Sequence, residues 1–315
     1  HTENSKFVYL SPQIPHFIDQ DGNIHLRPFI YEVELTINPE TWKREYSINK
    51  DKMIPIYFLV KGYEYKLMGV FNTDIHLFGI KHDQPFFIFG SDNLGRDVFS
   101  RIIYGARISL SIGLVGVFFS LIIGLIIGGI SGLYGGVIDL LIQRVMEIIM
   151  SIPKIPLWMA LSAALPSGWS SIKIYFGIRI LLSFVGWIKV ARVVRGKFLS
   201  LREMDFVLAA TAAGAGTWWN ITRHLIPNFM SYVIVQITLS IPGMILGETA
   251  LSFLAIGLRP PVVSWGVLLQ QAQNMRSVVL RPWLLIPGLF VIITVLCFNF
   301  VGDGRRDAAD PYFDE

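Results

Sequence analysis

The chain has 315 residues, of which 53% are hydrophobic and 16% are charged, and its mean hydropathy is +0.53. This apolar balance excludes an ordinary soluble domain and indicates a polytopic membrane protein. The net charge of +4 is small and spread along the chain, which argues against nucleic acid as a partner. A single cysteine, Cys297, excludes an intramolecular disulfide.

The first part of the chain differs from the rest. Residues 1 to about 95 contain 9 Lys or Arg and 12 Asp or Glu, with aromatic and β-branched residues between turn signals such as Asp21-Gly22-Asn23. This pattern predicts a small, mixed or β-rich soluble region. We place its boundary at residues 1–89, ahead of a transmembrane domain over residues 90–315.

Apolar runs dominate the sequence after Tyr104. About 20 apolar residues cross a hydrocarbon core of about 30 Å as a helix. We therefore predict an all-α membrane domain with five transmembrane helices, at 107–133, 137–165, 172–194, 228–250 and 282–302. The second of these is the least regular, because it contains four charged residues and two prolines: Asp139, Arg144, Glu147, Pro153, Lys154 and Pro156.

The distribution of basic residues predicts the orientation. The densest cluster follows the third span and comprises Lys189, Arg192, Arg195, Lys197 and Arg202. Basic residues near membrane spans favour the cytoplasmic side, so residues 201–228 and the C-terminus are expected inside and residues 1–89 outside. Arg96, Arg101 and Arg107 oppose this orientation. Since an external region needs a segment to carry it across the membrane, we expect a further transmembrane helix upstream, making six in all.

Two kinds of residue stand out inside the predicted spans. Small residues recur at every fourth position of the first span, at Gly116, Ser120, Gly124, Gly128, Gly132 and Gly136, which predicts close helix packing, with a substrate-lining stripe as the alternative. Charged residues at membrane depth are candidates for the translocation path. Arg144 and Glu147 share a helix face and Glu248 lies at the outer end of the fourth span, although a structural ion pair explains the first two equally well.

Between the third and fourth spans, residues 201–228 form a polar segment punctuated by Gly214 and Gly216. Its pattern predicts two short helices, the first over Phe206 to Ala213 with acidic residues at its start. Residues 251–269, rich in Gly, Pro and Trp, are expected to form an external or partly re-entrant loop and not another crossing.

Four sequence blocks resemble one family. Residues 209–228 contain two alanines, a glycine and the block HLIPN, which resembles the coupling loop of ATP-binding-cassette (ABC) importer permeases. The others are GSDNLGRDVFSRIIYGARISL at 90–110, ETALSFLAIGLRPPVVSWG at 248–266 and FNFVGDGRRDAADP at 298–311. Together they resemble the C-type permease subunit of peptide and nickel importers, from Gly90 to Pro311.

The resemblance implies a type I importer permease fold and a coupling loop that docks into a cytoplasmic ATPase. The loop residues it implies are Glu203, Asp205, Ala209, Ala210, Gly214, His224, Leu225 and Pro227. The chain departs from the family at Leu208, where the family has a glutamate before the two alanines. A leucine forms no salt bridge, so contact with the ATPase is expected to rest on shape and apolar burial.

The function implied is a permease subunit of an ATP-driven importer in the prokaryotic inner membrane, which passes peptides delivered by an external binding protein. Its implied partners are a homologous second permease and two ATPases, which hold the ATP and Mg, since the chain has no GxxxxGK[ST] loop. No metal or cofactor is expected on this chain, because its six histidines form no ligand cluster.

Three alternatives remain open at this stage. One is an importer of nickel or nickel chelates. A second is an ion-coupled secondary transporter that uses Arg144, Glu147 and Glu248. A membrane enzyme is the third, but no intramembrane Ser/His, Asp/Asp or HExxH arrangement of catalytic residues is evident in the sequence.

Overall fold

A computed structural model of the chain describes residues 4–40, 44–81, 85–166, 168–201, 203–216, 219, 223 and 226–308, except 68–70. The chain forms two compact units. Unit 1 combines His1–Ile103 with Asn274–Ile286, and unit 2 combines Tyr104–Gln273 with Pro287–Glu315. The two units are described separately.

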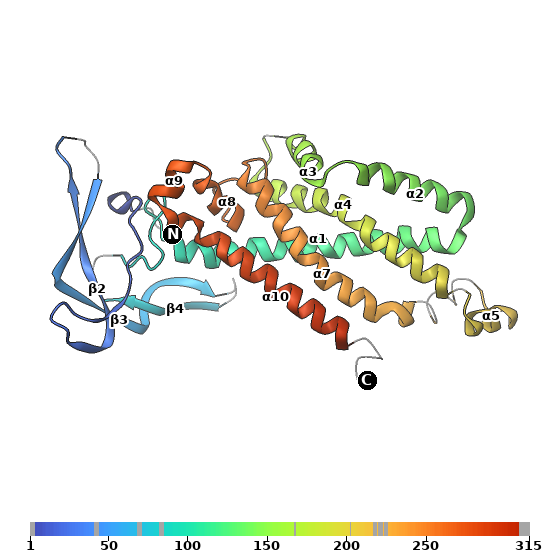
Figure 1. Cartoon of the computed structure of the whole chain (residues 1–315), viewed down its shortest axis with the longest axis horizontal. Coiled ribbons are helices and arrows are strands. Elements are labelled where there is room, and N and C mark those ends of the chain that lie inside the picture. The colour runs from blue at the N-terminus through green and yellow to red at the C-terminus, as the bar shows by residue number, and fades with distance from the viewer. Residues whose placement is uncertain are drawn as a thin grey trace. The chain divides into compact units, whose positions relative to one another are not determined.

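Unit 1 contains a four-stranded antiparallel sheet with the order β1-β2-β3-β4 (Figure 1). The strands are β1 (His16–Ile18), β2 (Ile24–Ile37), β3 (Arg44–Leu67) and β4 (Phe71–Ile80). The long strand β3 pairs with β2 through its first half and with β4 through its second half. Ile30 of β2 packs with Ile54 and Ile56 of β3 in a buried hydrophobic cluster. The prediction of a strand-rich region is confirmed.

The sheet is inserted between two chain segments that pair with each other. The amide of Tyr9 donates to the carbonyl of Asp92 (3.0 Å), and the amide of Gln13 donates to the carbonyl of Phe87 (2.9 Å). These bonds bring the start and the end of the sheet together. A short 3₁₀ turn, η1 (Ser5–Phe7), precedes this pairing, and helix α9 (Met275–Leu280) with turn η4 (Pro282–Leu285) completes unit 1.

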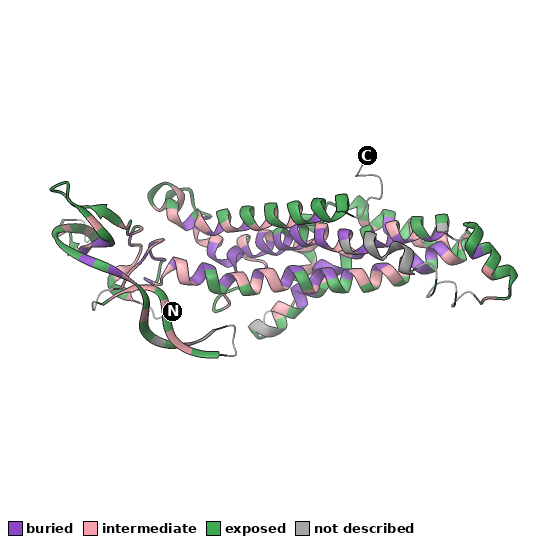
Figure 2. Cartoon of the chain, turned by 90° about the horizontal axis from the view of Figure 1, so that it is seen from below, coloured by how far each residue is buried: buried purple, intermediate pink, exposed green. Residues whose placement is uncertain are grey.

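Unit 2 is a helix bundle whose buried side chains face inward and whose exposed ones form outer stripes (Figure 2). Its helices are α1 (Val98–Tyr134), α2 (Gly136–Ser151), α3 (Lys154–Ala163), α4 (Ser171–Leu201), α5 (Asp205–Ala212), α7 (Ile226–Phe253), α8 (Trp265–Leu269), η3 (Gln270–Ala272) and α10 (Ile286–Ala308). Helix α5 and the α1–α2 turn lie at one end of the bundle, and α8 lies at the other (Figure 1).

Three helices of the part that the structure describes are long and apolar enough to cross a membrane: Val98–Tyr134, Lys173–Ser200 and Pro282–Ala308. They coincide with the first, third and fifth predicted spans. The fourth predicted span lies in the continuous 28-residue helix α7. Segment 254–281 holds only the short elements α8, η3 and α9, in agreement with the predicted loop at 251–269 apart from residues 251–253, which end α7.

The second predicted span differs from the prediction, because the structure divides it into α2 and α3. Ile152 has an extended backbone (φ −86°, ψ 128°), directly before Pro153. A proline disfavours the helical conformation in the preceding residue and lacks the N–H that a helix needs. Neither α2, with 16 residues, nor α3, with 10, reaches the usual length of one crossing.

The stripe of small residues on α1 packs against α4, which confirms the prediction of close helix packing. A Cβ placed on Gly124 would lie 2.5 Å from Val190 Cβ, and one on Gly132 would lie 2.7 Å from Phe198 Cβ. Both distances are below those that real Cβ atoms show, so the two backbones approach as closely as glycine allows. Gly136, predicted as the last member of the stripe, lies beyond α1, and a Cβ there would meet nothing within 4 Å among the described residues, because the chain turns at Gly135 and Gly136, which have φ values of 62° and 55°.

Candidate functional site

The first half of the predicted coupling loop is helix α5, which ends at Gly214. Asp205 lies in the first turn, where its negative charge is favourable. Gly214 has a φ of 89°, and the amide of Ala215 donates to the carbonyl of Ala210 (2.9 Å) across the helix end. A left-handed glycine after the last turn is a common helix stop. The predicted helix and its break at Gly214 are confirmed.

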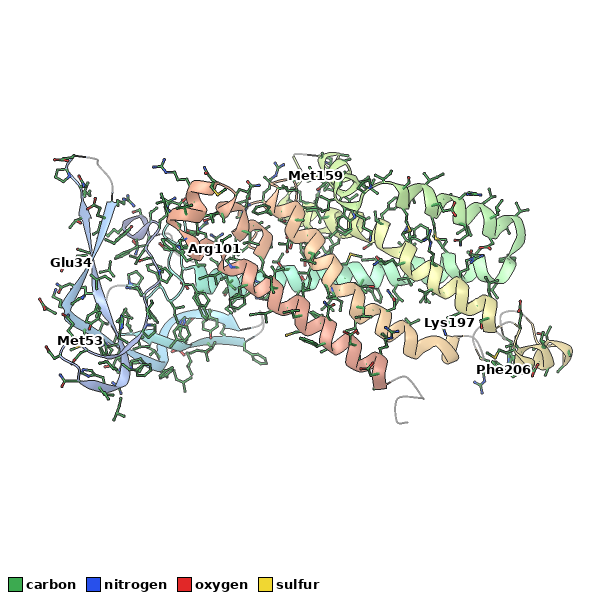
Figure 3. The ribbon with its side chains drawn as sticks, viewed as in Figure 1. Glu34, Met53, Arg101, Met159, Lys197 and Phe206 are labelled. Carbon is green, nitrogen blue, oxygen red and sulfur yellow. The ribbon has the colours of Figure 1, made fainter. Side chains whose placement is uncertain are left out.

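One side chain fixes α5 to the bundle. Val207 is 5% exposed and packs in a cluster of buried residues from α4 and α7: Val190, Val194, Phe198 and Val233. The two residues that flank Val207 along the helix are apolar and exposed, with Phe206 at 41% and Leu208 at 53% exposure. Figure 3 shows Phe206 on α5 and Lys197 near the end of α4. Helix α5 is therefore anchored through Val207 and presents exposed apolar side chains beside it.

The remaining predicted loop residues fall into two groups. Glu203, Asp205 and Ala209 are exposed, and Ala210 is half-buried. His224 and Leu225 lie outside the described residues, as does most of the predicted second short helix. Pro227 lies in the first turn of α7, where its missing N–H costs nothing.

The structure separates the three candidate residues for the translocation path into two places. On α2, Arg144 donates to Glu147 Oε2 at 2.8 Å, and the two side chains are 69% and 51% exposed. This confirms that they neutralise each other. Glu248, on α7, is fully buried and lies in a different set of contacts.

Serine hydroxyls surround the Glu248 carboxylate. Ser252 and Ser264 each donate to Oε1 at 2.8 Å, and Ser109 of α1 donates to Oε2 at 3.4 Å. Each hydroxyl oxygen also accepts a backbone N–H: Leu258 on Ser252, Val267 on Ser264 and Trp265 on Ser109. The cluster therefore joins α1, the end of α7, the loop after it and the start of α8.

Two cations of α4, the half-buried Arg195 and the buried Arg179, were not among the predicted site residues. Arg195 forms a bidentate pair with Asp139 of α2, with both N–O distances at 2.5 Å. Arg179 is 6% exposed, donates to Ser111 of α1 at 3.0 Å and lies 3.6 Å from the centre of the Tyr175 ring. Because these partners are 56 and 68 positions away from the arginines, no local pattern could have found them.

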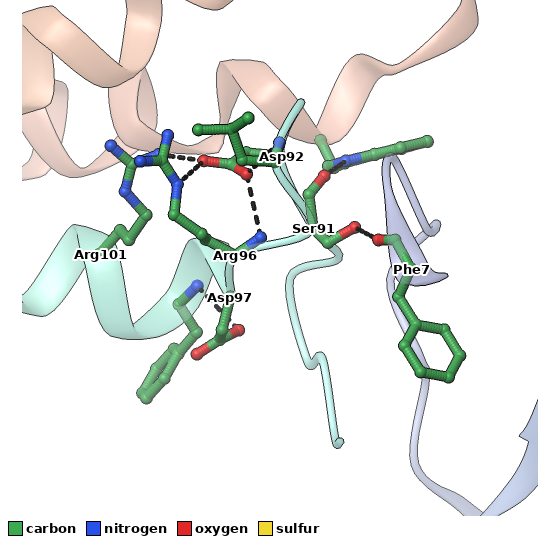
Figure 4. A network of polar contacts seen from close by, with 9 residues as sticks. Phe7, Ser91, Asp92, Arg96, Asp97 and Arg101 are labelled. Carbon is green, nitrogen blue, oxygen red and sulfur yellow. Dashed lines mark hydrogen bonds and ion pairs between the residues drawn. The ribbon is translucent and has the colours of Figure 1, made fainter. Parts of the chain in front are cut away.

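In unit 1, the block GSDNLGRDVFSR forms a buried polar cluster around Asp92 (Figure 4). The Asp92 carboxylate accepts the amides of Leu94 and Arg96, the Arg96 side chain at 2.8 Å, and the Arg101 side chain. Asp92 is 1% exposed and Arg101 is 2% exposed, so the ion pair is desolvated.

The same block caps α1 and ties in distant segments of unit 1. Asp97 accepts the amide of Ser100 at 2.8 Å, at the start of α1, and burial raises the pKa of this carboxyl. Ser91 accepts the Leu10 amide on its hydroxyl and the Trp283 indole N–H on its carbonyl. The block thus builds the junction from which both the sheet and α1 start.

Comparison with known proteins gives one consistent result. Residues 93–314 match the model of the family described as "Binding-protein-dependent transport system inner membrane component". The chain is 42% identical to the oligopeptide transport system permease protein OppC of Haemophilus influenzae, over 72% of this chain and 71% of that protein. It is 38% identical to the dipeptide transport system permease protein DppC of Bacillus subtilis, over 71% and 68% of the two chains.

The fold also resembles a solved transporter. A chain of the inward-facing MetNI methionine ABC transporter superposes with a TM-score of 0.52 at 17% identity, over 67% of this chain and 98% of that one. At this identity the similarity concerns the fold alone.

Proposed function

Because the chain belongs to the family of inner membrane components of binding-protein-dependent transport systems, we propose that it imports peptides across the bacterial inner membrane. It is the multi-pass permease component of an ABC importer and not the ATPase. Membership of this family implies an ATPase and a binding protein as partners. Peptides are favoured over nickel as substrate because the similar permeases serve oligopeptides and dipeptides.

In the assembly that we propose, the chain pairs with a homologous second permease and two ATPases bind from the cytoplasm. ATP and Mg are held by those ATPases. In this proposal α1, α4, α7 and α10 each cross the membrane and α2 together with α3 makes the fifth crossing, with residues 201–228 and the C-terminus inside. Residues 1–89 lie outside, where the binding protein arrives with its peptide.

The observation that carries the mechanism is the anchored helix α5. Its exposed apolar side chains Phe206 and Leu208, on two sides of the helix, suit an apolar cleft on the ATPase, and Leu208 replaces the family's glutamate in that contact. Val207 connects α5 to the ends of α4 and α7, so movement of the ATPase is passed to two helices of the bundle. Rocking of these helices would alternate access to the two membrane faces.

An ion-coupled transporter fits the contacts less well. Arg144 and Glu147 are paired with each other, and both Glu248 oxygens accept serine hydroxyls. A carrier of ions would need charged groups that change partners during transport. These three residues are therefore better explained as structural, and we attribute the driving force to ATP.

Substitution of Gly214 tests the coupling role. A side chain at this position meets nothing within 4 Å, but its φ of 89° strains any β-branched residue. Gly214→Val is therefore expected to move the end of α5 and to reduce ATP-driven peptide uptake about tenfold or more, with unchanged membrane insertion. Uptake is measured in proteoliposomes that contain the complete importer.

Gly216→Val is the matched control. Gly216 also has open space around it, but its φ lies outside the positive range. This variant should transport like the wild type. Wild-type uptake by Gly214→Val would contradict the coupling role of α5.

A further inference from the structure

A cleft opens in unit 2 at the break between α2 and α3. Its volume is about 70 Å³, and it lies between the break and the middle of α4. Its apolar walls include Ile152, Val185 and Ile188, and its polar lining comes from Lys154, Trp158 and Lys189. The break itself follows from Pro153, so the cleft is a direct result of the interrupted helix.

The two lysines give this cleft a positive charge. Lys154 and Lys189 both have exposed side chains, and no ion pair of the described residues joins either to a carboxylate. Lys154 is also the first residue of α3, whose N-cap Pro153 provides no side-chain acceptor. The partial positive charge of a helix N-terminus adds to that of the lysines. Two neighbouring ammonium groups without a counter-charge favour an anion between them.

Trp158 forms part of the same cleft wall. Its indole Nε1 is buried and has no hydrogen-bond partner among the residues that the structure describes. The other edge of the ring packs over Gly247 of α7, where an added Cβ would lie 2.9 Å from Cζ3. The ring is thus held in place, and a buried donor without an acceptor costs free energy.

We propose that this cleft binds the terminal carboxylate of a peptide on its way through the importer. The inference rests on the proposed peptide transport. The cleft is small, at about 70 Å³, and its two lysine ammonium groups suit a carboxylate, which they bind by charge-assisted hydrogen bonds. Every linear peptide has this group whatever its side chains, so one small cationic site serves substrates of varied sequence.

The position on broken helix α2–α3 agrees with this role. Discontinuous helices in transporters place helix ends and polar groups at substrate sites within the membrane. The exposed lysines leave the site open at the surface of unit 2, which allows weak and reversible binding. A carboxylate of the second permease is the rival occupant, and the experiment separates the two.

The test compares two peptides that differ only in a free or an amidated C-terminus, in proteoliposomes with the complete importer and saturated binding protein. Lys154→Met and Lys189→Met are expected to lower the ratio of free-acid to amide uptake about tenfold, since each loses a hydrogen bond to a charged group. Lys154→Arg should keep the ratio. Lys173→Met removes an exposed cation from the start of the same helix α4, away from the cleft, and should also keep it.

A second measurement does not depend on the preference of the binding protein. In a Cys297→Ser background, Ile152→Cys places a thiol in the cleft wall. Free-acid peptide should slow maleimide labelling of this thiol several-fold more than the amide does. Adding Lys154→Met should remove the difference.

The outcomes distinguish failure of the proposed carboxylate site from failure of the proposed peptide transport. Equal loss of both peptides in the lysine variants would indicate a partner carboxylate and overturn the proposal, as would an unchanged ratio with equal protection of the thiol. If the wild type imported neither peptide in response to ATP, the proposed function itself would fail.

Discussion

The Gly128→Leu substitution is expected to prevent folding of the helix bundle. A Cβ on Gly128 would lie 2.8 Å from Ala191 Cα and 2.9 Å from Val194 Cβ, so the obstacle includes backbone and cannot turn aside. Extra atoms in a tightly packed core cost about 1–3 kcal/mol per substitution, and a leucine adds four carbons. Even Gly128→Ala should lower the melting temperature of the detergent-solubilised protein by several degrees.

The neighbouring Gly129 is the control for this prediction. A Cβ there would meet only the Phe198 ring, at 3.9 Å, which is ordinary contact. Alanine also favours a helix interior over glycine by about 1 kcal/mol. Gly129→Ala should therefore leave the melting temperature unchanged or raise it. Equal melting temperatures for the two alanine variants would show that α1 does not pack on α4 through this stripe.

The Glu248→Ala substitution is expected to destabilise unit 2 by about 3 kcal/mol. Removing the carboxylate leaves the hydroxyls of Ser109, Ser252 and Ser264 buried without their acceptor. Each buried donor without a partner costs about 1–3 kcal/mol, part of which is recovered because a buried carboxylate no longer has to be desolvated. The loss appears in thermal unfolding of the purified protein.

Two further variants identify the cause. Glu248→Gln retains an Oε1 that accepts from Ser252 and Ser264, so its free energy of unfolding should fall by only about 1 kcal/mol. Glu147→Gln removes a charge from an exposed position and should leave the melting temperature nearly unchanged. A Glu248→Ala protein with wild-type stability and no peptide uptake would instead assign Glu248 to the translocation path.

Some features of this protein could be read from short stretches of sequence. The membrane class, the long apolar helices and the helix stop at Gly214 each depend on hydropathy or on backbone conformation within a few residues. The small-residue stripe predicted close packing for the same reason, since its four-residue period is set by helix geometry. The motif blocks at 90–110 and 248–266 indicated the family.

Other features depend on contacts between distant residues, which only the tertiary structure decided. Gly128 meets Ala191, Glu248 meets Ser109 and Arg195 meets Asp139 because the four helices α1, α2, α4 and α7 pack together. The charged residues of the second predicted span also have three different environments. Arg144 and Glu147 form an exposed ion pair on α2, Asp139 pairs with Arg195 of α4, and Lys154 lies at a cleft.

The sequence by itself therefore determined the kind of protein, most of its helices and the segment that we propose to face the ATPase, because hydrophobic length, glycine geometry and motif spacing are local properties. The tertiary structure decided which charged side chains are paired and which have no counter-charge among the described residues. The difference depends on desolvation and on the donors and acceptors that packing of the bundle brings together. Glu248 is enclosed by its hydrogen-bond donors, whereas the two lysines at the break after α2 line an open cleft.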